Sequence, residues 1–302
     1  MRVRGSVIRF KNKYHVENIK VYRAYAKQKI KSRIKKTESG IDTAVVIHLY
    51  YIEPLDLFQR KLALLRQGTY KVFVTIPRDD PGVKDMIKSR FPDSEIFVVP
   101  NRGRDVLPFL KIAKHLKQAG YTKILKIHSK KSIHRKDGDD WLSDIINELL
   151  PDDKEVREKI IQVLNMPTTS VVGPKEQYIS LPVNFDANSA HIQKIIGSLF
   201  GPKIRKQVDI KRDEYGFFAG TMFWARLDAL DGILNRKYTI SEFDTEKGQI
   251  DGTLAHGLER VFTLYPELNG KKIYGVNKIN VIELEHKTTN IPDWSDIYIG
   301  PK

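Results

Sequence analysis

Short apolar runs and helical stripes of apolar residues follow one another along most of this chain. Five apolar runs, each bounded by turn residues, have the length and the β-branched content of buried strands. These runs are residues 44–50, 70–76, 95–99, 122–128 and 170–174. Apolar residues at helical spacing separate them and predict helices. These helices are residues 54–66, 82–90, 105–118, 141–149 and 152–165. The alternation predicts an α/β fold, Rossmann-type, with a mostly parallel sheet flanked by helices.

The pattern is less regular after residue 175. Residues 175–215 predict irregular structure apart from a helix near 188–199. An apolar run over 217–224 predicts one further strand, and the spacing of apolar residues over 249–262 predicts a helix. We expect one α/β domain over residues 41–302, preceded by an amino-terminal arm over residues 1–40.

Composition limits the class of protein. The chain has 302 residues, of which 41% are hydrophobic, so it can form a packed core and global disorder is excluded. It has no cysteine, which excludes disulfides and thiolate metal sites. No apolar run approaches the roughly 18 residues of a membrane span, and no apolar block follows the charged amino terminus. We therefore expect a cytoplasmic protein.

The positive charge is concentrated in the arm. Net charge is +15, and residues 1–40 hold 13 Lys/Arg against 2 Glu, which leaves 39 Lys/Arg against 35 acidic residues in the rest of the chain. A basic face spread over a domain, as nucleic-acid binding needs, is not indicated. A local contact with the anionic inner face of the cell membrane is one interpretation of the arm. A solvated helix without a partner is the other.

Two loops at successive predicted strand ends carry groups that suit a phosphorylated ligand. Arg102, Gly103, Arg104 and Asp105 lie between a strand and a helix, where free amides and two guanidinium groups form an anion site that suits a diphosphate. A capped turn with two solvated arginines is the alternative. Strand 122–128 ends in the second cluster. Its members are His128, Ser129, Lys130 and Lys131. Sheet geometry can bring both loops to one crevice.

Two later segments could complete a site. The run around Phe218, Gly220, Thr221 and Trp224 combines small residues with aromatic rings, which suits a sugar or acceptor pocket, or equally an ordinary core strand. Asp251 falls in the first turn or at the cap of the helix predicted over 249–262. It is either a helix cap or a general base that takes a proton from an acceptor hydroxyl.

These motifs together resemble a known family. They are Asn101-Arg102-Gly103-Arg104-Asp105, Lys126-Ile127-His128-Ser129-Lys130-Lys131-Ser132, Phe218-Ala219-Gly220-Thr221-Met222-Phe223-Trp224 and Asp251-Gly252-Thr253-Leu254-Ala255-His256. In this order they resemble the rhamnan synthesis protein F family over about residues 43–265. The resemblance implies a glycosyltransferase that takes a sugar, often rhamnose from dTDP-rhamnose, to a growing lipid-linked or oligosaccharide acceptor of a bacterial surface polysaccharide.

The layout also resembles the GT-A glycosyltransferase fold. That fold normally has a metal-binding Asp-x-Asp where this chain has His128, Ser129 and Lys130, which puts a divalent metal in question. We therefore expect no cofactor besides the nucleotide-sugar donor, and an inverting reaction. Asp251 is then the base, the two basic loops hold the donor diphosphate, and His256 joins the sugar or acceptor pocket. Cationic side chains would do the electrostatic work of a metal.

Two other functions fit parts of the same pattern. A glycan- or nucleotide-binding module that partners another transferase would bind ligand without turnover. A nucleic-acid binder acting through the arm would show a steep dependence of affinity on salt.

Overall fold

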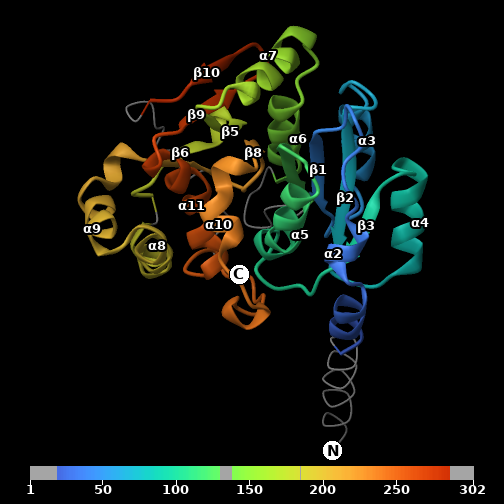
Figure 1. Ribbon diagram of the computed structural model, residues 1–302, viewed down its shortest axis with the longest axis horizontal. Coiled ribbons are helices and arrows are strands. Elements are labelled where there is room, and N and C mark those ends of the chain that lie inside the picture. The colour runs from blue at the N-terminus through green and yellow to red at the C-terminus, as the bar shows by residue number, and fades with distance from the viewer. Residues whose placement is uncertain (1–18, 130–137, 184, 286–302) are drawn as a thin grey trace, which may run out of the picture.

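The computed structural model describes residues 19–129, 138–183 and 185–285, and its centre is an eight-stranded sheet (Figure 1). The strands lie in the order β10-β9-β5-β8-β4-β1-β2-β3. Their bounds are β1 Thr43–His48, β2 Tyr70–Ile76, β3 Glu95–Val98, β4 Lys123–His128, β5 Thr169–Pro174, β8 Phe223–Arg226, β9 Lys272–Val276 and β10 Val281–Glu283. Strands β6 (Tyr178–Ser180) and β7 (Gly216–Phe218) pair separately.

The parallel part of the sheet follows the sequence prediction. β1 lies between β2 and β4 and pairs parallel with both, and β2 pairs parallel with β3. All six residues of β1 are buried, because both faces of the strand are covered. The register places His48 opposite His128, so β1 and β4 finish level with one another. We call the end of the sheet at which β1 to β4 finish its carboxyl end.

The other part of the sheet contains a reversed strand. β8 runs antiparallel between β4 and β5, whereas β5 and β9 pair parallel and β10 closes the edge antiparallel. Four of these seven pairings are parallel, which confirms the mostly parallel α/β sheet. Because β8 is reversed, it starts at the carboxyl end of the sheet, and the turn that precedes it lies beside the last residue of β4.

Helices cover both faces of the sheet (Figure 1). Helices α5, α8 and α11 pack on one face, here the α5 face, and α3, α6 and α7 pack on the other, the α6 face. The helices are α2 Ile30–Arg33, α3 Leu55–Leu62, α4 Pro81–Arg90, α5 Val106–Gln118, α6 Gly138–Leu149, α7 Lys154–Asn165, α8 Phe185–Phe200, α9 Pro202–Ile210, α10 Asp231–Asn235 and α11 Leu254–Leu268. Short 3-10 helices span Lys175–Gln177, Arg212–Glu214, Asp228–Leu230 and Ile240–Glu242.

The prediction of one strand over 217–224 is wrong. The run contains the end of β7, a turn, and the start of β8. Gly220 and Thr221 have φ of 88° and 51°, and two consecutive left-handed residues reverse the chain where a strand would continue. Apolar periodicity missed this turn because its residues are nearly as buried as those of the strands.

Two other boundaries differ from prediction. The residues between 175 and 215 contain helices α8 and α9 and strand β6, where we expected one helix in irregular structure. The helix predicted over 249–262 begins at Leu254 and continues to Leu268. Its N-cap is Thr253, so Asp251 lies before the helix and neither caps it nor belongs to its first turn.

The described part of the arm packs on the outer strand of the sheet. Residues 19–27 are helical, and the Gln28 side chain then donates to the Val98 carbonyl at 2.6 Å and accepts from its N–H at 2.9 Å. Further along, Arg33 donates to the Ile96 carbonyl at 2.9 Å. These contacts occupy backbone groups that an edge strand leaves open. Residues 1–18 of the predicted arm lie outside the described residues.

Candidate functional site

The candidate site begins at the carboxyl end of β4. Side chains alternate between faces along a strand, and Lys126 and His128 point to the α5 face while Leu125 and Ile127 belong to the core of the α6 face. The Lys126 ammonium lies 5.7 Å from the ring centroids of both Phe109 and Phe223. A lysine that is 1% exposed in such surroundings needs a counter-charge.

Asp105 supplies that counter-charge. Its carboxylate accepts hydrogen bonds from the Lys126 ammonium and the Thr221 hydroxyl, and Lys126 also donates to the Thr221 carbonyl. Burial alone would raise the pKa of Asp105, but Lys126, His128 and these hydrogen bonds hold it well below its usual range. Burial lowers the pKa of Lys126, and Asp105 opposes that effect. Asp105 occupies the N-cap position of α5, but its side chain accepts no hydrogen bond from the helix amides, so the alternative of a capped turn is wrong.

The turn before β8 connects this pair to helix α11. The Gly220 carbonyl lies 2.8 Å from Nε2 of His128, and the Gly220 N–H donates to Oε1 of Glu259 at 2.8 Å. A Cβ on Gly220 would lie 2.8 Å from the Trp141 ring, so the close approach needs a glycine as much as the positive φ does. Gly220 therefore contributes to the site through its backbone N–H and carbonyl. Thr221 contributes through its carbonyl and through the hydrogen bond from its hydroxyl to Asp105.

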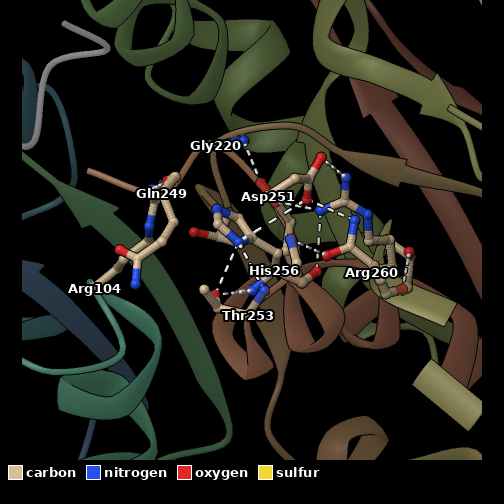
Figure 2. A network of polar contacts seen from close by, with 12 residues as sticks. Arg104, Gly220, Gln249, Asp251, Thr253, His256 and Arg260 are labelled. Atoms are coloured by element: carbon tan, nitrogen blue, oxygen red, sulfur yellow. Dashed lines mark hydrogen bonds and ion pairs between the residues drawn. The ribbon is translucent and has the colours of Figure 1, made fainter. Parts of the chain in front are cut away.

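Asp251 lies in a second group of charges near Gly220 (Figure 2). Its Oδ1 accepts from Nδ2 of Asn188 at 2.6 Å, and its Oδ2 lies 3.4 Å from Nη2 of Arg260. Arg260 also donates to Glu259 at 2.8 Å and covers the ring of Phe217 at 4.4 Å. The Asp251 side chain keeps 16% of its surface exposed, whereas Arg260 keeps 4%. The carboxylate is thus held by buried partners and reaches solvent.

His256 lies next to Asp251 but has a structural role at the helix start. Its Nδ1 lies 2.8 Å from the Thr253 hydroxyl and 3.9 Å from Oδ1 of Asp251 (Figure 2). Thr253 and His256 form a capping box at the first turn of α11. His256 is 4% exposed. Its contacts fix the start of α11 and, with it, the loop that carries Asp251.

The loop after β3 is joined to the segment that leads to Asp251. Arg102 donates to the Phe243 carbonyl at 3.1 Å, and Gly103 packs so tightly on the Phe243 ring that a Cβ would lie 2.3 Å from it. Arg104 donates to the Gln249 carbonyl (Figure 2), and its own N–H donates to Glu246 at 3.1 Å. An acidic side chain therefore occupies one amide of the predicted anion site. Both arginines remain partly exposed.

Ser129 ties two loops together at the carboxyl end of the sheet. Its hydroxyl accepts from the N–H groups of both Tyr50 and Tyr51 at 2.8 Å, and the residue is fully buried. It binds the loop after β1 to the end of β4, which is a different task from the predicted contact with donor phosphate. Lys130 and Lys131 lie outside the described residues, and their predicted role stays a prediction.

Replacing Ser129 with alanine is expected to lower the free energy of unfolding by roughly 1–3 kcal/mol, because the N–H groups of Tyr50 and Tyr51 lose a buried acceptor in a partly buried contact. Urea unfolding at neutral pH measures this change. Ser189→Ala is the matched control, because that hydroxyl donates to the Asp186 carbonyl in a solvent-exposed contact and accepts no backbone N–H among the contacts of the described chain. Equal effects of the two substitutions would contradict the bridging role.

Two predicted pocket residues lie in the core instead. Phe218 is 2% exposed and packs against Tyr178, with ring centroids 5.1 Å apart. Trp224 points to the α6 face, opposite to Lys126 and His128, and its Nε1 donates to the Leu149 carbonyl at 2.8 Å. The structure therefore does not bring either ring to the other candidate groups. The reason is the period of two along β8, which turns Trp224 away from the face that carries Phe223.

Sequence reasoning assigned no site role to five residues that the structure brings to this region. They are Lys126, Asn188, Glu246, Glu259 and Arg260. Asn188 begins the helix predicted near 188–199, Glu246 lies in a segment without a predicted element, and Glu259 is predicted only as part of the helix over 249–262. Burial raises the pKa of Glu259, with Arg260 and the Gly220 N–H opposing. Its spacing offered a signal, because Glu259 follows His256 by three residues and shares its helix face.

We call the set that converges on the Gly220 turn the site network. Its members are Asp105, Lys126, His128, Asn188, Gly220, Thr221, Asp251, Glu259 and Arg260. Charged groups of both signs meet here at the carboxyl end of the sheet, where ligands bind in open α/β folds. Across the residues that the structure describes, no three His, Asp or Glu side chains are grouped as metal ligands.

Comparison with known proteins assigns the chain to a family. The family described as rhamnan synthesis protein F matches residues 10–270. The chain belongs to the rhamnan synthesis protein F family. Similar proteins are "Uncharacterized protein WxcX" from two strains of Xanthomonas campestris pv. campestris, each 31% identical over 237 residues, or 78% of this chain. The chain spans 32% of the length of these relatives.

Membership of the rhamnan synthesis protein F family relates the chain to polysaccharide synthesis and confirms the resemblance drawn from its motifs. The whole site network lies inside the matched residues 10–270. Within the described residues, no helix is both long enough and apolar enough to cross a bilayer.

Proposed function

We propose that the chain is a glycosyltransferase that moves a sugar from a nucleotide donor to a growing bacterial surface polysaccharide. Rhamnose from dTDP-rhamnose is the first donor to test. The observation that carries the proposal is the position of Asp251, a carboxylate fixed by buried Asn188 and Arg260 and still 16% exposed at the carboxyl end of the sheet. Membership of the rhamnan synthesis protein F family supports a polysaccharide as the acceptor.

Asp251 is proposed as the general base. A base must lie within hydrogen-bond reach of the acceptor hydroxyl and hold its geometry while the proton moves. Asn188 donates to Oδ1 and also accepts from the Gly252 N–H at 3.1 Å, which fixes both the carboxylate and the backbone that follows it. Arg260 offsets its negative charge. In an inverting reaction the deprotonated hydroxyl attacks the anomeric carbon, and the nucleoside diphosphate leaves.

The departing diphosphate needs positive charge. We propose that Arg102, Arg104 and His128 supply part of it, together with Lys130 and Lys131, so that the reaction needs no divalent metal. Arg104 is restrained by the Gln249 carbonyl and has Glu246 nearby, with 4.0 Å between Nε and Oε2. Glu246 offsets some of its charge, so Arg104 would position the diphosphate more than it neutralises it.

The test begins with a thermal-shift screen of nucleotide sugars, because a ligand that binds only the folded state must raise its stability. A donor that binds is then assayed for transfer with and without EDTA. We expect turnover that EDTA leaves within about twofold. Full loss in EDTA, restored by Mn²⁺, would reject the metal-independent reaction while leaving the transferase proposal standing.

A second function is supported by the length of the relatives. Because the chain spans 32% of each WxcX protein, catalysis could reside in another part of such proteins. The chain would then be a glycan- or nucleotide-binding module that partners a transferase. Donor binding with neither transfer nor donor hydrolysis, even with the correct acceptor, would favour this function.

A further inference from the structure

The described part of the amino-terminal arm presents positive charge to solvent. Residues 19–40 contain eight Lys/Arg and one acidic residue, Glu38. Seven of the eight cations are exposed. They are Lys20, Arg23, Lys27, Lys29, Lys31, Lys35 and Lys36. Along the described chain, none of these seven has a salt-bridge partner, whereas Arg33, which faces the sheet, pairs with Glu95 at 3.4 Å. The charge is therefore available to an external anion.

The arm is held in a fixed orientation. Val21 and Ala24 of its helical segment pack against the core of the α6 face, and Gln28 pairs with Val98 at the carboxyl end of β3. The opposite face of the helix then points to solvent and carries Lys20, Arg23 and Lys27, which are spaced at i, i+3 and i+7. A free tail would not present these cations in one direction.

The arm extends beyond the carboxyl end of the sheet, where the candidate site lies. From Gln28 to Arg33 the chain runs antiparallel to β3, so residues 19–27 lie past the carboxyl end of that strand. Figure 1 shows this helix projecting from the sheet next to β3. The loop after β3, with Arg102 and Arg104, starts from the same place.

Exposed apolar side chains gather at this end. Six large hydrophobic residues are exposed in the described part of the chain, and four of them belong to segments at the carboxyl end. Ile19 and Tyr22 lie on the arm helix, Ile52 in the loop after β1, and Ile250 in the segment that contacts Arg104 through Gln249. Apolar side chains among cations are typical of surfaces that lie on a membrane, where rings and alkyl groups enter the headgroup region.

We propose that residues 19–36 form a docking surface for an anionic phospholipid membrane and turn the carboxyl end of the sheet toward it. Charge complementarity selects an anionic surface, and the neighbouring Ile and Tyr side chains favour a lipid surface over a nucleic acid. Binding itself does not depend on transferase activity. Only its use, to hold the site near a membrane-bound acceptor, rests on the proposed function.

The test is sedimentation of the full chain with phospholipid vesicles. Each basic side chain near an anionic surface contributes about a fivefold factor to binding. We expect binding to vesicles with 30% phosphatidylglycerol that falls steeply with salt, and little binding to phosphatidylcholine alone. The variant Lys20→Glu/Arg23→Glu/Lys27→Glu is expected to lose about 100-fold or more in partition coefficient.

A matched variant separates local docking from net charge. Lys203→Glu/Arg205→Glu/Lys206→Glu makes the same charge change on exposed positions of α9, at the far side of the molecule from the arm (Figure 1). It is expected to bind within about threefold of the wild type. An equal loss in both variants, binding independent of lipid charge, or preference for a DNA duplex over anionic vesicles would each overturn the proposal. Thermal unfolding confirms that both variants fold.

Transfer to a soluble acceptor distinguishes this inference from the proposed function. The arm variant is expected to keep soluble-acceptor turnover while losing vesicle binding. Vesicle binding by a chain that never turns over would support the membrane surface and reject the transferase.

Discussion

Replacing Asp251 with asparagine is expected to lower the rate of sugar transfer by about 10²–10⁴-fold, the usual contribution of a positioned general base. The amide keeps the size of the side chain and can still meet Asn188 and Arg260, but it cannot take the proton of the acceptor. Donor binding and the unfolding temperature are expected to stay close to those of the wild type. Single-turnover rates with saturating donor, together with donor titrations, measure both quantities.

Two variants make the Asp251 result interpretable. Asp244→Asn, at an exposed position of the same segment, is the control and should keep wild-type turnover. Glu259→Gln tests the other carboxylate of the site network, which contacts both Gly220 and Arg260. Near-normal turnover in Asp251→Asn together with a large loss in Glu259→Gln would move the base from Asp251 to Glu259.

Replacing Lys126 with methionine is expected to lower the free energy of unfolding by roughly 3–5 kcal/mol, because the buried Asp105 carboxylate loses its counter-charge. Methionine fills much of the lysine stem, so packing against Phe109 and Phe223 is largely kept. The double variant Asp105→Asn/Lys126→Met removes both charges and is expected to recover at least about 1 kcal/mol. Lys154→Met, an exposed position, should change stability by less than ~0.5 kcal/mol.

The effect of Lys126→Met should depend on pH. In the wild type the pKa of Asp105 is depressed, so its contribution to stability is present above the ordinary Asp range and is lost as pH falls below it. Without Lys126, burial raises the pKa of Asp105, and the variant gains stability as pH falls and the carboxyl becomes protonated. Urea unfolding at pH 7 and pH 4.5 should therefore show a smaller difference between variant and wild type at pH 4.5. A difference that stays constant would show that packing, not charge, accounts for the loss.

The site was partly predictable from sequence. Arg102, Asp105 and His128 are predictable as site residues because polar groups follow buried strands, and parallel strands finish at the same end of a sheet. That rule placed Asp105 and His128 correctly beside one another. The same reasoning could not foresee that Asp105 would turn inward to Lys126, because a lysine inside an apolar strand is indistinguishable from a surface lysine until its neighbours are known.

For the aromatic residues Phe218 and Trp224, the sequence predicts a shared pocket that the structure does not form. Phe218 and Trp224 are close in sequence, and one continuous strand over 217–224 would place both in the same pocket. A turn at Gly220 and Thr221 separates them, and the alternation of side chains along β8 sends Trp224 to the far face of the sheet. Left-handed backbone at a threonine carries no clear sequence signal, since it is stabilised here by the hydrogen bond from Thr221 to Asp105.

Sequence by itself determined the strand and helix alternation, the parallel part of the sheet, the family, and the concentration of positive charge in the arm. These follow from local periodicity, from motif order and from composition, which need no knowledge of distant neighbours. Tertiary structure alone decided that β8 runs in reverse, that Asn188 and Arg260 hold Asp251, and that the basic helix lies at the same end of the sheet as the site. Each of these depends on residues far apart in the chain, and only the packing of the folded core fixes which of them meet.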